Sequence, residues 1–309
     1  MSAMLAATLA ASWTPPAKIR SVLSDVDGTL FPFGTSSPLS AGNVAALTEA
    51  MNRGAHVGLA TGRIPGPWSA AIHAALPGLG ASVYGNGGLV VDAAGQVIFE
   101  AALPDEAAER VRQYTLNGRA QNGKRLAVLA TTRWQVADGS QYSHHYVELA
   151  PAGETFCTRL IKNAAEPAML VTEFPAQLPS ILKFVIFTDP ENAEWASMPE
   201  TVERLRRVLD GTGAVVLDCG AKQCEVFAPG VNKGSGVARL LEHLNVPTSE
   251  TMALGDAEND VEMLRLVGAG VAMGNANEAA RTAADVVVGT SDQDGVAEAV
   301  RRFVFGETV

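Results

Sequence analysis

The stretch Ser24-Asp25-Val26-Asp27-Gly28-Thr29-Leu30 decides the fold of this 309-residue chain and points to its chemistry. It follows the apolar run 19–24, which has the length and composition of a buried strand. In an open parallel sheet, ligands bind outside the carboxyl ends of the strands, so Asp25 and Asp27 fall where a site is expected. Gly28 permits a sharp turn, which lets both carboxylates face one hard cation.

This stretch has two other interpretations, an ordinary turn and the start of a calcium-binding loop. A calcium loop that began at Asp25 would need Gly and Glu at two later positions, where the chain has Leu30 and Ser36. The calcium loop is therefore excluded. On this motif alone, the ordinary turn stays open.

On both sides of the stretch, short apolar runs alternate with longer helical patterns. This alternation predicts an α/β fold, a Rossmann-like core built on a parallel sheet. We expect its strands at residues 19–24, 56–60, 81–84, 251–254, 270–273 and 285–288. We expect its helices at residues 40–52, 233–244, 260–267, 277–284 and 294–303.

The pattern changes in the middle of the chain, where a hairpin at 89–91 and 97–100 precedes scattered helices and strands. Further strands are expected at 125–130, 183–188, 214–218 and 225–228. We therefore expect a discontinuous core, interrupted by an inserted α+β domain and preceded by a peripheral tail. The expected boundaries are 1–16 for the tail, 17–88 and 229–309 for the core, and 89–228 for the inserted domain.

Three further motifs lie at strand-to-helix junctions of the core. Thr61-Gly62-Arg63 ends a predicted strand and offers a hydroxyl and a backbone amide to a phosphate oxygen. Asn232-Lys233-Gly234 opens a predicted helix, where the ammonium can neutralise a phosphate or a carboxylate. The segment 255–260 (GDAEND) brings several carboxylates after another strand. Each motif has an ordinary structural interpretation, but one crevice would collect all of them.

The order and residue types of these motifs resemble the haloacid dehalogenase superfamily of phosphohydrolases. The matching segments are SDVDGTL (24–30), ATGR (60–63), NKGSGV (232–237) and GDAENDVEM (255–263). The spellings NKG and GD-x-x-ND, with a long insert between the second and third motifs, most closely resemble the Cof-type phosphatases. In those proteins an α+β cap of the class IIB type lies at that point. The resemblance covers about residues 19–88 and 229–290.

The resemblance implies a catalytic role for four residues. Asp25 would attack phosphorus and form an aspartyl-phosphate intermediate. Asp27 would protonate the leaving alkoxide and then deprotonate the attacking water. Thr61 and Lys233 would hold the phosphoryl oxygens, and Lys233 would also screen the charge of Asp25.

The resemblance also implies Mg²⁺ as cofactor. Its ligands would be the Asp25 carboxylate, the Asp27 backbone carbonyl and Asp256, and Asp260 and Asn259 would support them from the next layer of residues. A cation is also expected on physical grounds. An anionic carboxylate cannot approach an anionic phosphate monoester in an acidic pocket without one.

Substrate contacts are expected from residues next to the motifs, namely Gly62, Arg63, Asn86 and Asn259. The inserted domain would decide which metabolite is accepted. His144 and His145 are adjacent on an expected strand, and neighbouring strand residues point to opposite faces, so the pair is not expected to share a metal.

Composition restricts the possible partners and location. With 23 Lys and Arg against 33 Asp and Glu, the net charge is -10, so nucleic acid is not expected. No stretch approaches the ~18 apolar residues of a membrane span. Three cysteines, Cys157, Cys219 and Cys224, form neither a disulfide framework nor a metal pair. We expect them to be small core residues of a cytoplasmic protein.

The leading hypothesis is therefore a Mg²⁺-dependent phosphatase of small phosphorylated metabolites, such as sugar phosphates, that acts as a monomer or small homo-oligomer. Two alternatives stay open. A phosphomutase of the same superfamily would pass the phosphoryl group to a second hydroxyl of the sugar. A non-catalytic phosphate- or metal-binding regulator would not need the Asp25 and Asp27 pair.

Overall fold

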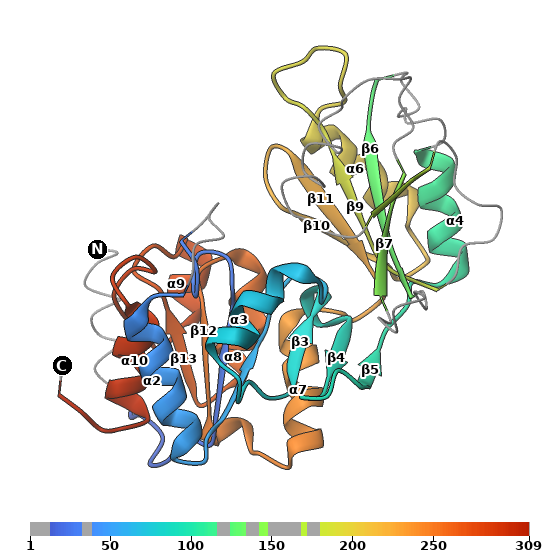
Figure 1. The fold of residues 1–309 in the computed structure, drawn as a ribbon. Coiled ribbons are helices and arrows are strands. Elements are labelled where there is room, and N and C mark those ends of the chain that lie inside the picture. The colour runs from blue at the N-terminus through green and yellow to red at the C-terminus, as the bar shows by residue number, and fades with distance from the viewer. Residues whose placement is uncertain are drawn as a thin grey trace. The chain divides into compact units, whose positions relative to one another are not determined.

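The computed structural model describes residues 13–32, 39–115, 124–133, 142–147, 168–171 and 180–308. The chain divides into two compact units, coloured along the chain in Figure 1. Unit 1 comprises Met1–Ile64, Ser69–Phe99 and Asn232–Val309, and unit 2 comprises Pro65–Trp68 and Glu100–Val231. Unit 1 is thus discontinuous in sequence, and unit 2 is inserted in it.

Unit 1 is built on a parallel sheet of the order β14-β13-β12-β1-β2. An isolated parallel bridge from Ala60 to Val83 links the end of β2 to the small sheet β3-β4-β5. The strands are β1 (Ser21–Ser24), β2 (His56–Leu59), β3 (Ser82–Tyr84), β4 (Leu89–Val91), β5 (Val97–Glu100), β12 (Thr251–Gly255), β13 (Ala269–Ala272) and β14 (Val286–Val287). The helices are α2 (Ala41–Asn52), α3 (Ala70–Ala75), α7 (Lys233–Leu244), α8 (Val261–Leu266), α9 (Glu278–Ala283) and α10 (Gly295–Phe303).

The strand order reverses between β1 and β12. From β1 the chain passes through α2 to β2 on one side, and from β12 it passes through α8 to β13 on the other. Because parallel crossovers are right-handed, these two connections place α2 and α8 on opposite faces of the sheet (Figure 1). A sheet of this kind has its ligand crevice at the carboxyl ends of the strands beside the reversal.

Local sequence explains how the elements at this crevice begin. Ser40 caps α2, because its side chain accepts a hydrogen bond from the Asn43 backbone N–H. Asn232 caps α7 with a reciprocal pair of hydrogen bonds to Ser235. Behind the crevice, apolar side chains of the strands pack against α7, α8 and α9 in one buried cluster that includes Leu23, Ala253, Leu240, Met263 and Ala280.

Unit 2 is an α+β unit with a six-stranded sheet of the order β10-β11-β9-β6-β7-β8. The sheet is antiparallel except for the pairing of β7 with β8. Helices α4 and α6 share a buried apolar cluster with the sheet, including Val111, Leu205, Phe184 and Val226. The elements are α4 (Asp105–Tyr114), β6 (Ala127–Arg133), β7 (Tyr142–Val147), β8 (Ala168–Val171), β9 (Ile181–Phe187), α6 (Met198–Val208), β10 (Val215–Asp218) and β11 (Gln223–Phe227).

Three observations bear on the expected domain boundary, the tail and a cysteine. The inserted domain was expected from residue 89, but β4 pairs with β3, so the hairpin belongs to unit 1. Of the tail expected at residues 1–16, the structure describes residues 13–16, and there Trp13 packs edge-on against Phe303 and its indole N–H donates to the Gly268 carbonyl. Cys219 was expected in the core and is exposed after β10.

Two remaining expectations concern cysteines and membranes. Cys224 is buried, as expected, and Cys157 lies outside the described residues. Among the helices that the structure describes, none combines the length and the apolar character that a membrane crossing needs.

Candidate active site

The residues that follow the central strands meet at one end of the unit 1 sheet. Asp25 follows β1, Thr61 follows the end of β2, and Asp256 follows β12. Backbone hydrogen bonds align the carboxyl ends of these strands. The Asp25 N–H donates to the Leu254 carbonyl, and the Ala60 N–H donates to the Ser24 carbonyl. The candidate site therefore lies at the carboxyl ends of the strands, as the sequence predicts, and beside the reversal of strand order.

Lys233 is the cation at the centre of this group. Its Nζ donates to Asp25 Oδ1 and to Asp260 Oδ1, both at 2.6 Å. The side chain comes from the first turn of α7, and Lys233 is 1% exposed. A charge so deeply buried needs paired and hydrogen-bonded partners, and here two carboxylates supply them.

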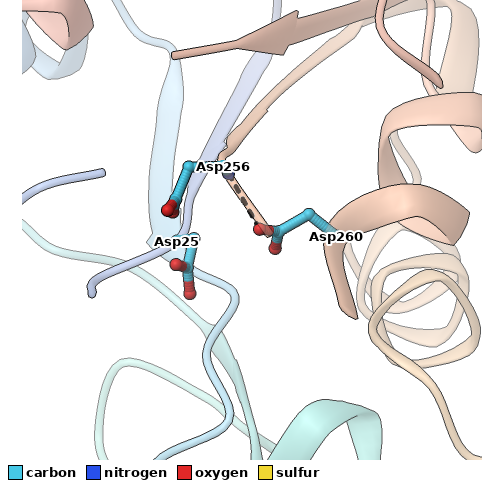
Figure 2. A group of neighbouring side chains, drawn as sticks. All are labelled: Asp25, Asp256 and Asp260. Atoms are coloured by element: carbon cyan, nitrogen blue, oxygen red, sulfur yellow. Dashed lines mark hydrogen bonds between the residues drawn. The ribbon is translucent and has the colours of Figure 1, made fainter. Parts of the chain in front are cut away.

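Both carboxylate oxygens of Asp260 accept hydrogen bonds within this group. Its Oδ1 accepts from Lys233, and its Oδ2 accepts from the backbone N–H groups of Asp256 and Ala257, each at 2.9 Å. The hydrogen bond to Asp256 is drawn in Figure 2. Because both oxygens are engaged, Asp260 is suited to orienting its neighbours rather than to direct metal ligation.

Asp25, Asp256 and Asp260 form a group whose ligand atoms lie within 4.8 Å of one another (Figure 2). Asp256 Oδ1 accepts a hydrogen bond from the Thr29 hydroxyl at 3.0 Å. Within the described part of the chain, Asp25 Oδ2 receives no hydrogen bond. A set of carboxylate oxygens is what a hard divalent cation such as Mg²⁺ prefers, so the donor set fits this ion.

Burial and mutual repulsion raise the pKa values of these carboxyl groups. Burial raises the pKa of Asp25 well above its usual value, Asp260 and Asp256 push it in the same direction, and Lys233 opposes them. Burial and the charge of Asp260 raise the pKa of Asp256 to about 6. For Lys233, burial lowers the pKa, but Asp25 and Asp260 outweigh it and raise the pKa above the usual value. The group is thus short of positive charge, which a bound cation would supply.

Asp27 and Arg63 form an ion pair at the edge of the site. Arg63 Nε donates to Asp27 Oδ2 at 2.7 Å, and Arg63 Nη2 donates to Asp27 Oδ1 at 2.5 Å. This fork-to-fork geometry orients the carboxylate strongly. Both side chains stay about one-third exposed, at 30% for Arg63 and 34% for Asp27. Arg63, which the sequence assigns to the substrate, therefore also contacts the proposed acid and base directly.

The remaining predicted residues surround Thr61. Its Oγ1 accepts from the Arg63 backbone N–H at 3.1 Å, and among the described residues its O–H has no acceptor, so it can donate to a ligand. The Asn86 N–H donates to the Thr61 carbonyl, and the Asn86 side-chain amide lies against Gly62. Asn259 Nδ2 donates to Asn86 Oδ1 at 2.9 Å. All ten predicted site residues thus belong to unit 1. Hydrogen bonds join one group around Lys233 and a second group around Thr61, and Gly62 lies against Asn86 of the second group.

Sequence reasoning missed two residues that contact this region. Thr29 orients Asp256, although it stands inside the opening motif. Asn275 donates from Nδ2 to the Gly28 carbonyl at 2.8 Å. It follows β13, so it carries the same signal as the others, a polar residue just beyond a predicted strand.

Comparison with known proteins identifies relatives of the whole chain. A sequence profile of haloacid dehalogenase-like hydrolases matches residues 22–300. The chain is 30% identical over 296 residues to the chloroplastic endoribonuclease YbeY of Arabidopsis thaliana, covering 93% of this chain and 47% of that protein. It is 27% identical over 288 residues to YkrA of Bacillus subtilis, named as a phosphatase, covering 91% of this chain and 96% of that one. The chain spans less than half the length of the first curated relatives it matches.

Solved structures show the same fold. A haloacid dehalogenase superfamily phosphatase of Bacteroides thetaiotaomicron, BT1666, superposes with a TM-score of 0.71 at 25% identity, covering 94% of this chain and 98% of that one. BT4131, described as a subclass IIB sugar phosphatase, superposes with a TM-score of 0.71 at 22% identity, covering 92% of this chain and 98% of that one.

Proposed function

The chain belongs to the haloacid dehalogenase-like hydrolases, and on that basis we propose that it is a Mg²⁺-dependent phosphatase of small phosphomonoesters. The observation that carries this proposal is the buried Lys233, which joins Asp25 to Asp260 beside Asp256. Such a site presents a carboxylate nucleophile, a fixed positive charge and oxygen ligands for a cation within one small volume.

In the proposed reaction, a carboxylate oxygen of Asp25 attacks phosphorus, and the bond from phosphorus to the leaving alkoxide oxygen breaks. Asp27 gives its proton to that oxygen, and the alcohol leaves. Asp27 then takes a proton from a water molecule, which attacks the aspartyl-phosphate and releases inorganic phosphate with regeneration of Asp25. Arg63 donates one hydrogen bond to each oxygen of Asp27, so each oxygen keeps a second lone pair for the proton that Asp27 gives and takes.

Other residues of the chain hold the phosphoryl group. The Thr61 hydroxyl and the Lys233 ammonium would bind its oxygens, and Gly62 and Asn86, which lie beside Thr61, would contact the substrate. Asp25, the Asp27 backbone carbonyl and Asp256 would hold Mg²⁺. When bound, the ion would neutralise the charge that accumulates between the phosphoryl group and the acidic site. The sugar phosphatase among the structural relatives supports sugar phosphates as the substrate class.

The decisive experiment compares wild type, Asp25→Asn and a matched Asp→Asn control with an aryl phosphate and Mg²⁺. We expect wild type to release phosphate and Asp25→Asn to release none, because an amide cannot serve as the nucleophile. The control is Asp92→Asn, which makes the same change in the turn between β4 and β5 and should keep its activity.

Two further arms complete this experiment. Chelation of Mg²⁺ should stop phosphate release by wild type, and full activity of Asp25→Asn would contradict the mechanism. Product analysis with a hexose 1-phosphate separates a phosphatase from a phosphomutase. Formation of the hexose 6-phosphate without free phosphate would contradict the phosphatase proposal.

A further inference from the structure

The β13–α9 loop, residues 273–277, contacts the segments that carry the candidate site and contains no charged residue. Its Asn275 bridges two other segments of unit 1. Asn275 Nδ2 donates to the Gly28 carbonyl at 2.8 Å, and Asn275 Oδ1 accepts from the Ser291 backbone N–H at 2.9 Å. One side-chain amide thus ties the turn after β1 to the segment after β14.

The turn that Asn275 holds contains the backbone carbonyl that we assign to the cation. That carbonyl, of Asp27, belongs to the same planar peptide unit as the Gly28 N–H, which donates to the Phe31 carbonyl at 2.7 Å. The next peptide unit is held through the Gly28 carbonyl by Asn275. With both units fixed, the Asp27 carbonyl keeps one direction. Gly28 itself has a φ of +85°, a conformation that other residues rarely adopt, so the turn needs glycine at this position.

The same loop also contacts the second proposed ligand. The Asn277 backbone N–H donates to the Asp256 carbonyl at 2.8 Å. The loop is itself anchored by Arg281 of α9, whose Nε donates to the Ala276 carbonyl at 2.8 Å and whose Nη2 donates to the Gly274 carbonyl. The β13–α9 loop therefore supports both the Asp27 and the Asp256 segments.

We propose that Asn275 is a positioning residue for the cation: it sets the direction of the Asp27 carbonyl through its hydrogen bond to Gly28. The inference rests on the proposed function, because that function assigns the carbonyl to Mg²⁺. Groups that orient a metal ligand typically change metal affinity by about 10- to 100-fold when they are removed. Loss of the Asn275 amide should therefore weaken Mg²⁺ binding while leaving every proposed ligand in the chain.

The test measures the dissociation constant of Mg²⁺ alone by calorimetric titration of the full chain. We expect Asn275→Ala to raise this constant by about tenfold. Asn275→Ser, which keeps a polar but shorter side chain, should do the same. The control is Asn245→Ala at the end of α7, where Asn245 has a φ of 52°. This change should lower the melting temperature, because alanine tolerates that conformation poorly, and leave the Mg²⁺ constant unchanged.

A second readout separates positioning from a general structural effect. With an aryl phosphate, the rate of Asn275→Ala should recover at high Mg²⁺ concentration, because the weakened site fills again. A lower melting temperature with an unchanged Mg²⁺ constant in both Asn275 variants would overturn the inference. If wild type itself bound no Mg²⁺, the metal assignment of the proposed function would be wrong, and the inference would be overturned with it.

Discussion

At Lys233, one ammonium balances two carboxylates, with both hydrogen bonds at 2.6 Å. The pair Lys183 and Glu225 in unit 2 offers a useful comparison, since these side chains are also buried and 2.9 Å apart. Removing one partner of a buried pair leaves an uncompensated charge, which typically costs about 3–5 kcal/mol. The two lysines differ in that only Lys233 contacts residues assigned to the cation.

For Lys233→Met, we expect a loss of about 3–5 kcal/mol in the free energy of unfolding. The loss should be larger near pH ~8 than near pH ~5. Asp25 already has a raised pKa in the folded protein, and without Lys233 the native state binds still more protons than the unfolded chain, so stability falls as pH rises. Urea denaturation at the two pH values measures this.

The control for this prediction is Lys183→Met. It should lose comparable stability, but Mg²⁺ should recover a larger part of the loss in Lys233→Met, where the ion also neutralises Asp25 and Asp260. Equal recovery in both variants would contradict the assignment of the cation to this group.

His56 predicts a separate pH effect. Its Nδ1 lies 3.0 Å from the hydroxyl of Ser21, the first residue of β1. Its Nε2 lies 3.0 Å from the carbonyl of Ala81, the residue before β3, so the ring bridges these two segments. Burial lowers the pKa of His56 from 6.5 to about 4, and the hydrogen bond to Ala81 opposes this shift. The folded protein therefore prefers the neutral ring.

Stability should fall as pH decreases from about 6.5 to about 4, because only the unfolded chain takes up the proton in this range. The full effect is up to about 3 kcal/mol, from about 1.4 kcal/mol per unit of pKa. In His56→Gln this part of the pH dependence should be absent. Thermal unfolding across this pH range provides the measurement, and an unchanged profile in His56→Gln would show that other groups cause it.

Among the elements, α7 depends on its contact with the loop that follows β3. In that loop Gly87 has a φ of +98°, and a Cβ built on it would lie 2.0 Å from the Asn232 carbonyl oxygen. Gly95, in the turn between β4 and β5, has a φ of +78° but open space around the same position. The two glycines share a backbone conformation and differ in steric contact.

We expect Gly95→Ala to cost about 1–2 kcal/mol, which reflects the backbone conformation alone. Gly87→Ala should cost a further ~1–3 kcal/mol, because the new methyl group pushes against the start of α7. Only Gly87→Ala should also reduce phosphatase activity, since Asn232 caps the helix that carries Lys233. Urea denaturation and an aryl phosphate assay test both statements; equal costs would show that the clash relaxes freely.

The same elements show what a sequence can and cannot predict. The expected ranges for α7, β4 and β5 match the structure, because capping residues, apolar periodicity and turn residues are local signals. Placement of Asp25, Thr61, Lys233 and Asp256 at strand-to-helix junctions follows from the same signals.

Side-chain partners between distant segments were not predictable in this way. The pairing of Arg63 with Asp27 and the bridge from Asn275 to Gly28 depend on side-chain geometry between separate loops. Trp13 was missed because its partners, Phe303 and Gly268, lie near the other end of the chain.

At the scale of the whole molecule, every residue assigned to the cation belongs to unit 1. A ligand that binds only the native state raises the free energy of unfolding of the unit that binds it. The increase is about 2.7 kcal/mol when the ligand concentration is 100-fold above its dissociation constant. We expect Mg²⁺ to slow amide hydrogen exchange in β1 and β12 and to leave β6 and β9 unchanged.

Hydrogen exchange followed by mass spectrometry resolves these segments. Asp256→Asn serves as the control and should show no response to Mg²⁺, because it lacks a proposed ligand. Equal protection of strands in both units would show instead that the two units unfold together.

The hydrogen bond between Asp25 and Lys233 joins residues that are 208 positions apart. During synthesis, β1 emerges early, but its neighbour β12 and the lysine of α7 emerge only after all of unit 2. Until then Asp25 cannot form its hydrogen bond with Lys233. All of unit 2, Pro65–Trp68 and Glu100–Val231, is synthesised before Lys233, so it can fold on the ribosome first. The discontinuity of unit 1 thus delays assembly of the site until translation is nearly complete.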